Sequence, residues 1–280
     1  MTITWPVLLA VLLGALLHAS WNALVKSSQD KTLDTALIHL LCSVLALPFC
    51  LYLGPPPMQA WPFILASLVI HVGYYFALSG AYKHGELGLT YPMMRGTAPM
   101  LVALASMAVL GEALTAWGWL GVALICGGVL LLGSGAALVQ NRKAVLFALS
   151  NAVLIAIYTV VDAQGARLSG NVAQYVALLF ALDGWPFALM VFLHRKGQVW
   201  PYVRQRWPVA VGGAVASLGS YAIALWAMTL APVAMVAALR ETSVLFAAIL
   251  GAWLLKEPWT RLRFLGTGVM VAGVMSLRLG

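Results

Sequence analysis

Apolar runs of about twenty residues follow one another along the whole chain, separated by short polar or basic segments. A helix needs roughly 20 mostly apolar residues to cross a bilayer. Broken at proline, glycine and charged residues, the runs predict ten spans, at 5–25, 33–53, 61–82, 88–110, 116–138, 144–166, 172–193, 208–230, 232–254 and 260–279. The longest connection, His194 to Trp207, has the length of a lid or a basic surface loop. The pattern therefore predicts an all-α polytopic membrane protein with almost no soluble part.

Composition agrees with this assignment, since 62% of the 280 residues are hydrophobic and only 9% are charged. A soluble domain has about 25% charged and about 45–50% apolar residues. The first run could be a signal peptide, but no basic residue precedes it, and its polar end, HASWNALVK, is a poor cleavage site. We interpret it as a retained helix. The cysteines (Cys42, Cys50, Cys126) lack the paired spacing of a disulfide or metal site, which favours packing roles.

The net charge of +8 comes mostly from one side of the predicted membrane. Of the 16 lysines and arginines, only Arg167 and Arg278 fall on the other side, and Arg95 and Arg240 lie within spans. Loops rich in lysine and arginine mark the cytoplasmic side. We therefore expect a cell (inner) membrane protein with both termini outside the cytoplasm, and the basic charge predicts no nucleic-acid partner.

The two halves of the chain match each other when one is shifted so that Arg95 falls on Arg240. The same shift also aligns Thr97 with Thr242, Glu112 with Glu257, Thr115 with Thr260, Gly121 with Gly266 and Gly128 with Gly273, and a looser match sets Trp21 over Tyr158. Each half has an odd number of predicted spans, five, so the second half must run inverted in the membrane. Inverted repeats are a signature of secondary transporters, whose substrate site lies at the repeat interface near the midplane. We assign residues 1–138 and 144–280 to two inverted five-helix repeats.

Two of the matched segments also resemble a known family. GEALTAWGWLGVALICGGVLLL and KEPWTRLRFLGTGVMVAGVMSL resemble the two copies of the fourth-to-fifth-helix segment of EamA-type carriers, in the drug/metabolite transporter (DMT) superfamily. HASWNALVK is similar to the polar end of that family's first helix. The resemblance implies a cavity between the repeats, export of a metabolite or drug, and no ATP hydrolysis. Members are usually drawn with cytoplasmic termini, whereas the basic loops here predict the reverse, so the direction of transport stays open.

The two arginines within spans are the strongest candidates for a functional site. A charge in lipid costs several kcal/mol, so Arg95 and Arg240 need a partner or a function. Both lie roughly 10–12 Å deep in their spans, which predicts that they converge on one central cavity. A planar guanidinium suits a carboxylate, phosphate or phosphonate. The alternative is a structural role, in which each arginine binds backbone carbonyls or pairs with an acid. Pro92, Gly96 and Pro99 surround Arg95 and predict a kinked helix with free carbonyls.

Polar and aromatic residues of other spans could complete that cavity. His18, Trp21 and Asn22 share one face of the first helix by their three- and four-residue spacing. Tyr75 and Tyr158 lie beside polar residues in the third and sixth spans, so together with Trp21 they are candidates to line the cavity. Aromatic residues near span ends instead often form interfacial belts.

Glu241 breaks the symmetry of the repeat, because its counterpart is Gly96. Neighbouring residues of a helix point about 100° apart, so Glu241 does not simply pair with Arg240. It could meet Arg95 across the cavity, or it could exchange a proton as intramembrane carboxyls do in carriers. Protons are therefore a candidate coupling ion.

Four further titratable residues lie within the spans. Asp162 and Asp183 fall close enough to helix ends to be solvated or to cap them, and Asp162 is the second candidate for coupling. His39 and His71 are interpreted as packing residues rather than ligands. No metal site, phosphate-binding loop or nucleophilic triad is recognisable, so no cofactor and no enzymatic activity are expected.

These patterns favour a secondary transporter that moves a small organic metabolite by alternating access. An amino acid or another carboxylate- or phosphonate-bearing solute would satisfy both the arginines and the aromatic residues. Two other functions stay open: an exporter of drugs or cationic metabolites with the same fold, and an integral-membrane lipid-modifying enzyme. The enzyme is disfavoured because its class needs a His/Asp/Glu cluster facing an interfacial loop, and the loops here are short and plain.

Overall fold

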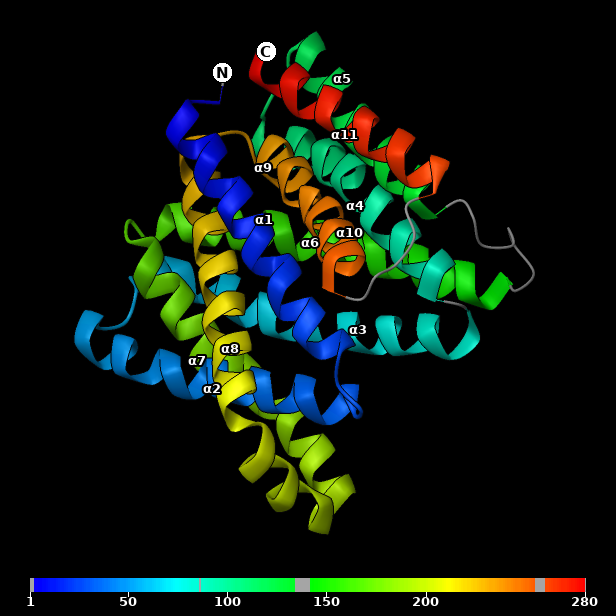
Figure 1. Ribbon diagram of the computed structural model, residues 1–280. Coiled ribbons are helices and arrows are strands. Elements are labelled where there is room, and N and C mark those ends of the chain that lie inside the picture. Colours follow the sequence, from blue (N-terminus) through cyan, green and yellow to red (C-terminus); the bar gives the residue numbers. More distant parts are fainter. Residues whose placement is uncertain (1–2, 86, 134–141, 255–259, 280) are drawn as a thin grey trace.

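The computed structural model describes residues 3–85, 87–133, 142–254 and 260–279, and the described residues form helices and short connections without a strand (Figure 1). The helices are α1 (Trp5–Lys26), α2 (Lys31–Leu53), η1 (Met58–Ala60), α3 (Trp61–His84), α4 (Leu87–Leu110), α5 (Ala116–Gly133), α6 (Arg142–Leu168), α7 (Val172–Arg195), η2 (Lys196–Gln198), α8 (Val199–Leu230), α9 (Val233–Arg240), α10 (Thr242–Leu254) and α11 (Arg261–Leu279).

Eight helical runs within the described ranges are long and apolar enough to cross a membrane, which makes the chain a multi-pass membrane protein. One of these runs, Val172–Leu230, contains both α7 and α8, and the apolar helix Ala116–Leu132 is shorter than the others. Ten crossings follow only if α7 and α8 are counted separately and α5 is included. The number ten therefore stays a prediction.

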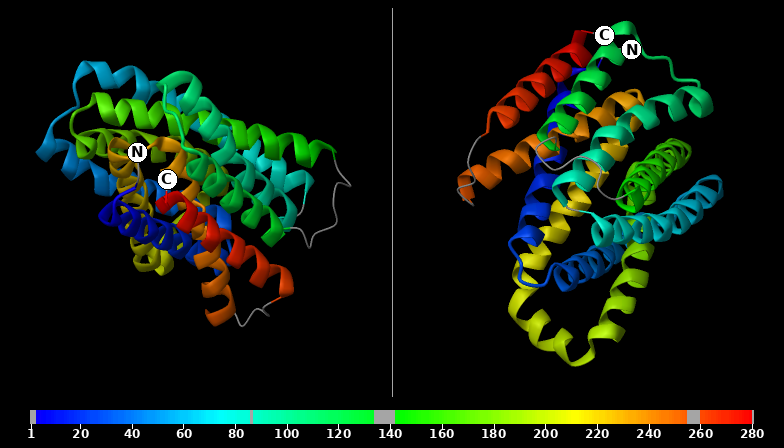
Figure 2. Two further views of the ribbon diagram at one scale, coloured as in Figure 1. Left: turned by 90° about the horizontal axis from the view of Figure 1, so that it is seen from above. Right: turned by 90° about the vertical axis from the view of Figure 1, so that its right-hand side faces the viewer.

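The surface loop expected between His194 and Trp207 is wrong, because most of this segment is helical. α7 continues to Arg195, a turn at Lys196 (φ 33°) reverses the chain, and α8 begins at Val199. Pro201 is tolerated because it lies in the first turn of α8, where its missing N–H has no helical partner in any case. Figure 2 shows the ends of α7 and α8 joined at this turn.

Equivalent helices of the two halves pack against each other with reciprocal contacts. A Cβ placed on Gly121 would lie 2.9 Å from the carbonyl oxygen of Gly273, and one on Gly273 would lie 2.9 Å from that of Gly121. Gly128 and Gly266 face each other in the same way, at 2.8 and 2.9 Å. These crossed contacts mean that α5 and α11 run antiparallel, as equivalent helices of inverted repeats do. Small residues bring the two backbones together.

Other helices also pack against helices of the opposite half. α3 packs on α6 while α8 packs on α1, and α2 packs on its own equivalent α7. Residues far apart in sequence then meet at two opposite faces of the molecule. At one face, here called the terminal face, both chain ends lie close together (Figures 1 and 2), and the Arg278 guanidinium lies 5.0 Å from the Trp5 ring. The other face carries the α1–α2 and α7–α8 connections and is called the basic face.

The kink expected in the fourth span does not interrupt its helix: α4 stays helical through Pro92 and Pro99. The interruption lies instead in its counterpart, where α9 ends at Arg240 and α10 begins at Thr242. Glu241 occupies the turn between them, and its N–H donates to the Ala238 carbonyl three residues back. The described structure thus places the helix break where the repeat departs from symmetry.

Candidate functional site

A small central cavity lies where the fourth spans of the two halves meet. Its lining comes from α4, α6, α9 and the turn after α9, and consists of Arg95, Ala98, Pro99, Val102, Ile155, Tyr158, Thr159, Ala237, Arg240 and Glu241. Both arginines and Tyr158 thus reach one cavity. Its volume is about 10 Å³, which is about the room one water molecule needs, so in this conformation the cavity is too small for an organic solute.

Arg95 forms an ion pair across the cavity. Its Nε lies 2.8 Å from Oε2 of Glu241, and the two side chains are only 12% and 5% exposed. This is the contact that the sequence left open as one alternative for Glu241. Because both charges are desolvated, removing one partner would leave the other buried and unpaired. Whether Glu241 also exchanges protons stays a prediction.

Arg240 has a different environment. Its guanidinium lies 5.3 Å from the centroid of the Tyr221 ring, a cation–π distance. Within the part of the chain that the structure describes, no ion pair joins Arg240 to an acid. The cavity therefore holds two guanidinium groups against the single carboxylate of Glu241, and its surplus charge is positive.

The three predicted residues of the first helix lie together but do not line the cavity. Trp21 Nε1 approaches His18 Nδ1 at 3.4 Å, and Asn22 Nδ2 donates to the His18 carbonyl at 2.7 Å. Both cavity arginines act electrostatically on His18. Trp21 and Asn22 thus both contact His18, and the binding roles of all three residues stay predictions.

The two tyrosines predicted to line the cavity lie at different places in the structure. Tyr158 is 8% exposed and lines the cavity. Tyr75 lies elsewhere: its hydroxyl is 3.3 Å from His39 Nδ1, and its ring stacks on Phe187 at 5.1 Å. A role for Tyr75 in contacting substrate would need the cavity to extend toward α2 and α7.

The expectation that Asp162 and Asp183 are solvated or cap helix ends is wrong. Asp162 is fully buried (0% exposed) and accepts hydrogen bonds from the Tyr175 hydroxyl, at 2.8 Å, and from the Tyr221 hydroxyl. Asp183 Oδ1 lies 3.2 Å from His71 Nδ1. Both carboxylates lie one to three turns inside their helices, and side chains of neighbouring helices contact them there. Sequence reasoning missed Tyr175, although the i, i+4 spacing of Tyr158 and Asp162 already indicated a polar face of α6.

An ion-pair network joins the two halves at the terminal face. Glu112, before α5, accepts from Arg167 Nη2 at 2.5 Å and from the Val233 N–H, at the start of α9, at 2.8 Å. Arg167 also donates to the Met228 carbonyl at the end of α8, at 2.7 Å from Nη2. Glu112 therefore places a negative charge at the N-terminus of α9, and Arg167 places a positive charge at the C-terminus of α8. The helix dipoles favour both arrangements.

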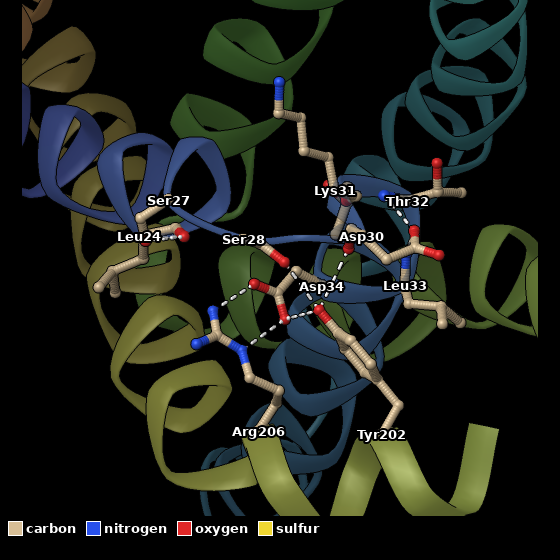
Figure 3. A network of polar contacts seen from close by, with 11 residues as sticks. Leu24, Ser27, Ser28, Asp30, Lys31, Thr32, Leu33, Asp34, Tyr202 and Arg206 are labelled. Carbon is tan, nitrogen blue, oxygen red and sulfur yellow. Dashed lines mark hydrogen bonds and ion pairs between the residues drawn. The ribbon is translucent and has the colours of Figure 1, made fainter. Parts of the chain in front are cut away.

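A second network joins the halves at the basic face (Figure 3). Arg206 of α8 binds Asp34 of α2 with both ends of its fork, at 2.6 and 3.3 Å. The Tyr202 hydroxyl donates to Asp34 Oδ1 at 2.7 Å and lies 2.8 Å from Ser28 Oγ. Asp34 is 2% exposed. Nothing local in the sequence indicated this pairing, because its partners are 172 residues apart.

No group of three or more His, Cys, Asp or Glu residues that could hold a metal ion occurs among the described residues. Two of the three charged groups of the central cavity are guanidinium groups, which are not metal ligands.

Comparisons with known proteins agree with this fold. The model of the EamA-like transporter family matches residues 5–134 and again residues 142–279. A solved structure described only as "Crystal structure of protein" has a TM-score of 0.77 at 18% identity, covering 98% of this chain and 95% of that one, which shows a shared fold. No curated protein matches. Because the family model covers nearly the whole chain in two copies, as the sequence motifs predicted, the chain belongs to the EamA-like transporter family.

Proposed function

We propose that this membrane transporter carries small carboxylate-bearing metabolites, with amino acids as the first class to test, and that its binding site is the central cavity. One observation carries the proposal: two guanidinium groups and one carboxylate line the cavity, which leaves a surplus positive charge. An anionic group would balance that charge, whereas a cation would add to it. The buried Tyr158 offers apolar surface for the rest of the solute.

The ion pair of Arg95 and Glu241 suggests how the site binds and releases its substrate. A carboxylate that enters the cavity competes with Glu241 for Arg95, and the fork of Arg95 can hold it with two hydrogen bonds. Arg240, which has no acid partner among the described residues, can bind the second carboxylate oxygen. When the substrate leaves, Glu241 returns to Arg95, so neither charge stays unpaired in the closed state.

The networks at the two faces fit alternating access. Each joins an acid of the first half to an arginine of the second half, Glu112 to Arg167 at the terminal face and Asp34 to Arg206 at the basic face. Both networks are formed in this conformation, in which the cavity is too small for an organic solute. Opening one while the other holds would expose the cavity to a single side of the membrane, which is the requirement of alternating access. Because the basic loops predict the cytoplasmic side, export would begin with opening of the basic face.

Counterflow in proteoliposomes tests this function. Vesicles loaded with unlabelled L-leucine should accumulate external tritiated L-leucine, because a carrier exchanges solute in both directions. L-leucinamide is the matched control, since it keeps the side chain and the ammonium group but lacks the carboxylate. We expect L-leucine and other amino acids to compete with the label and L-leucinamide not to compete. Absence of L-leucine counterflow, together with counterflow of labelled L-leucinamide in vesicles loaded with L-leucinamide, would instead support the exporter of cationic metabolites, with Glu241 as the binding group.

A further inference from the structure

A second cluster of charged groups lies in the interior, outside the arginine cavity. His71 of α3 and Asp183 of α7 form a pair at 3.2 Å, each with 13% of its side chain exposed. Asp162 of α6 is fully buried and acts electrostatically on His71. The substrate site proposed above uses none of these three residues.

The surroundings of His71 come from four helices. Tyr158 of α6, Asp183 of α7 and Tyr74 of its own helix lie next to His71. Asp162 of α6 and His39 of α2 are the other titratable groups close enough to interact with it electrostatically. Two of these groups are carboxylates, and both would be stabilised by a positive charge on the imidazole. The two carboxylates have different partners: Asp183 pairs with His71, whereas tyrosine hydroxyls donate to both oxygens of Asp162. His71 is therefore the group on which a proton can reside, and the two negative carboxylates would stabilise its protonated, positively charged form.

Two tyrosines connect this cluster to the arginine cavity. Tyr158 lines the cavity, and its ring centroid lies 4.7 Å from that of His71. Tyr221 donates to Asp162, and its ring lies under the Arg240 guanidinium. A substrate that moves Arg240 or Tyr158 would therefore shift a neighbour of Asp162 or His71 in the same step.

We propose that His71, Asp162 and Asp183 form a proton-binding site, which takes up a proton at one face and releases it at the other during transport. This inference rests on the proposed transport function. The proton resides on the imidazole of His71, and no bond to the substrate forms or breaks. Histidine is the side chain that changes charge near neutral pH, and buried histidine and carboxyl groups relay protons in membrane carriers. Glu241 is less suited, because its carboxylate is the counterion of Arg95.

Proton titration of the purified protein tests the site without any substrate. An unbuffered sample brought from about pH 8 to about pH 5 should take up about one proton per chain more than the His71→Gln variant does. His39→Gln is the matched control, since His39 is also an interior histidine but its hydrogen-bond partner is the Tyr75 hydroxyl. We expect His39→Gln to behave as the wild type. Equal proton uptake by His71→Gln and wild type would overturn the proposal.

Flux measurements then test coupling. Wild-type proteoliposomes should accumulate tritiated L-leucine when a pH gradient is imposed, and His71→Gln and Asp183→Asn should lose that accumulation while they keep counterflow at equal pH. Failure of counterflow in the wild type would refute the amino-acid substrate and leave the titration to decide on the proton site. Gradient-driven accumulation that persists in His71→Gln, or that is lost in Glu241→Gln alone, would overturn the coupling role of His71.

Discussion

Two sets of equivalent helices differ in how far they keep the symmetry of the repeat. The first set is α5 and α11, and the second is α4 with its counterpart, α9 and α10. In α5 and α11 the aligned glycines contact each other crosswise at nearly equal distances. In the other pair the arginines and threonines align, yet Gly96 packs against α5 while Glu241 interrupts its helix and reaches Arg95. The helices that pack the two halves together, α5 and α11, thus keep the symmetry of the repeat. The cavity lies where that symmetry is lost, at Glu241.

The two threonines that lie two residues after Arg95 and Arg240 also differ, in their hydrogen bonds. Thr97 Oγ1 donates to the carbonyl of Met93, four residues back, at 2.6 Å, as expected in a continuous helix. Thr242 Oγ1 donates to the carbonyl of Leu239, three residues back, at 2.7 Å, beside the break. The position that carries glycine in one copy and glutamate in the other thus differs both in charge and in local helix geometry.

The largest effect is expected where symmetry is kept. In Gly128→Ala the new Cβ would lie 2.8 Å from the Gly266 carbonyl oxygen and 3.1 Å from the Met270 nitrogen, both backbone atoms that cannot move freely. Overpacking of this kind destabilises by about 1–3 kcal/mol. Thermal unfolding in detergent should show a lower Tm. Gly127→Ala is the control, because nothing lies within 4 Å of its Cβ, and an equal loss in both variants would contradict the close packing of α5 on α11.

A smaller, conformational effect is expected at the basic face. Arg206→Gln leaves the buried Asp34 without its cation, which should favour opening of that face. An engineered Thr159→Cys in the cavity lining should then react several-fold faster with a maleimide added from the basic side. Arg195→Gln is the matched control, since Arg195 lies 3.7 Å from Asp30, is 40% exposed and contributes little. Unchanged labelling in Arg206→Gln would remove Asp34 and Arg206 from gating.

The smallest effect on transport is expected from two single cysteines, which test only the orientation of the chain in the membrane. Cysteines introduced near Gly280 and at Gln140 should differ in labelling from outside intact cells, with only the first accessible, because the basic loops predict a cytoplasmic position for Gln140. Neither change should alter transport. Labelling at Gln140 alone would reverse the assignment of the two faces and the predicted direction of transport.

The sequence predicted the helices and the repeat because apolar length and aligned arginines, threonines and glycines are local, countable features. It also predicted a shared cavity for Arg95 and Arg240, offered Tyr158 as a candidate for its lining, and left open the pairing of Arg95 with Glu241. It could not find the ion pair of Asp34 with Arg206 or the tyrosines around Asp162, since those contacts depend on how distant helices pack. The helix break at Glu241 was missed because no proline or glycine lies within two residues of it, and the kink expected around Arg95 stays a prediction.

The central claim is that the two arginines recognise a carboxylate, and the variants Arg95→Lys and Arg240→Lys test it most directly. Both keep the positive charge and lose the planar fork, so folding should persist while binding loses its two-pronged geometry. We predict that each lowers tritiated L-leucine counterflow by on the order of tenfold, the factor expected for about 1.4 kcal/mol, with an unchanged Tm. Normal counterflow in either variant would contradict carboxylate recognition at that arginine, and aggregation of both would show that the arginines serve the fold instead.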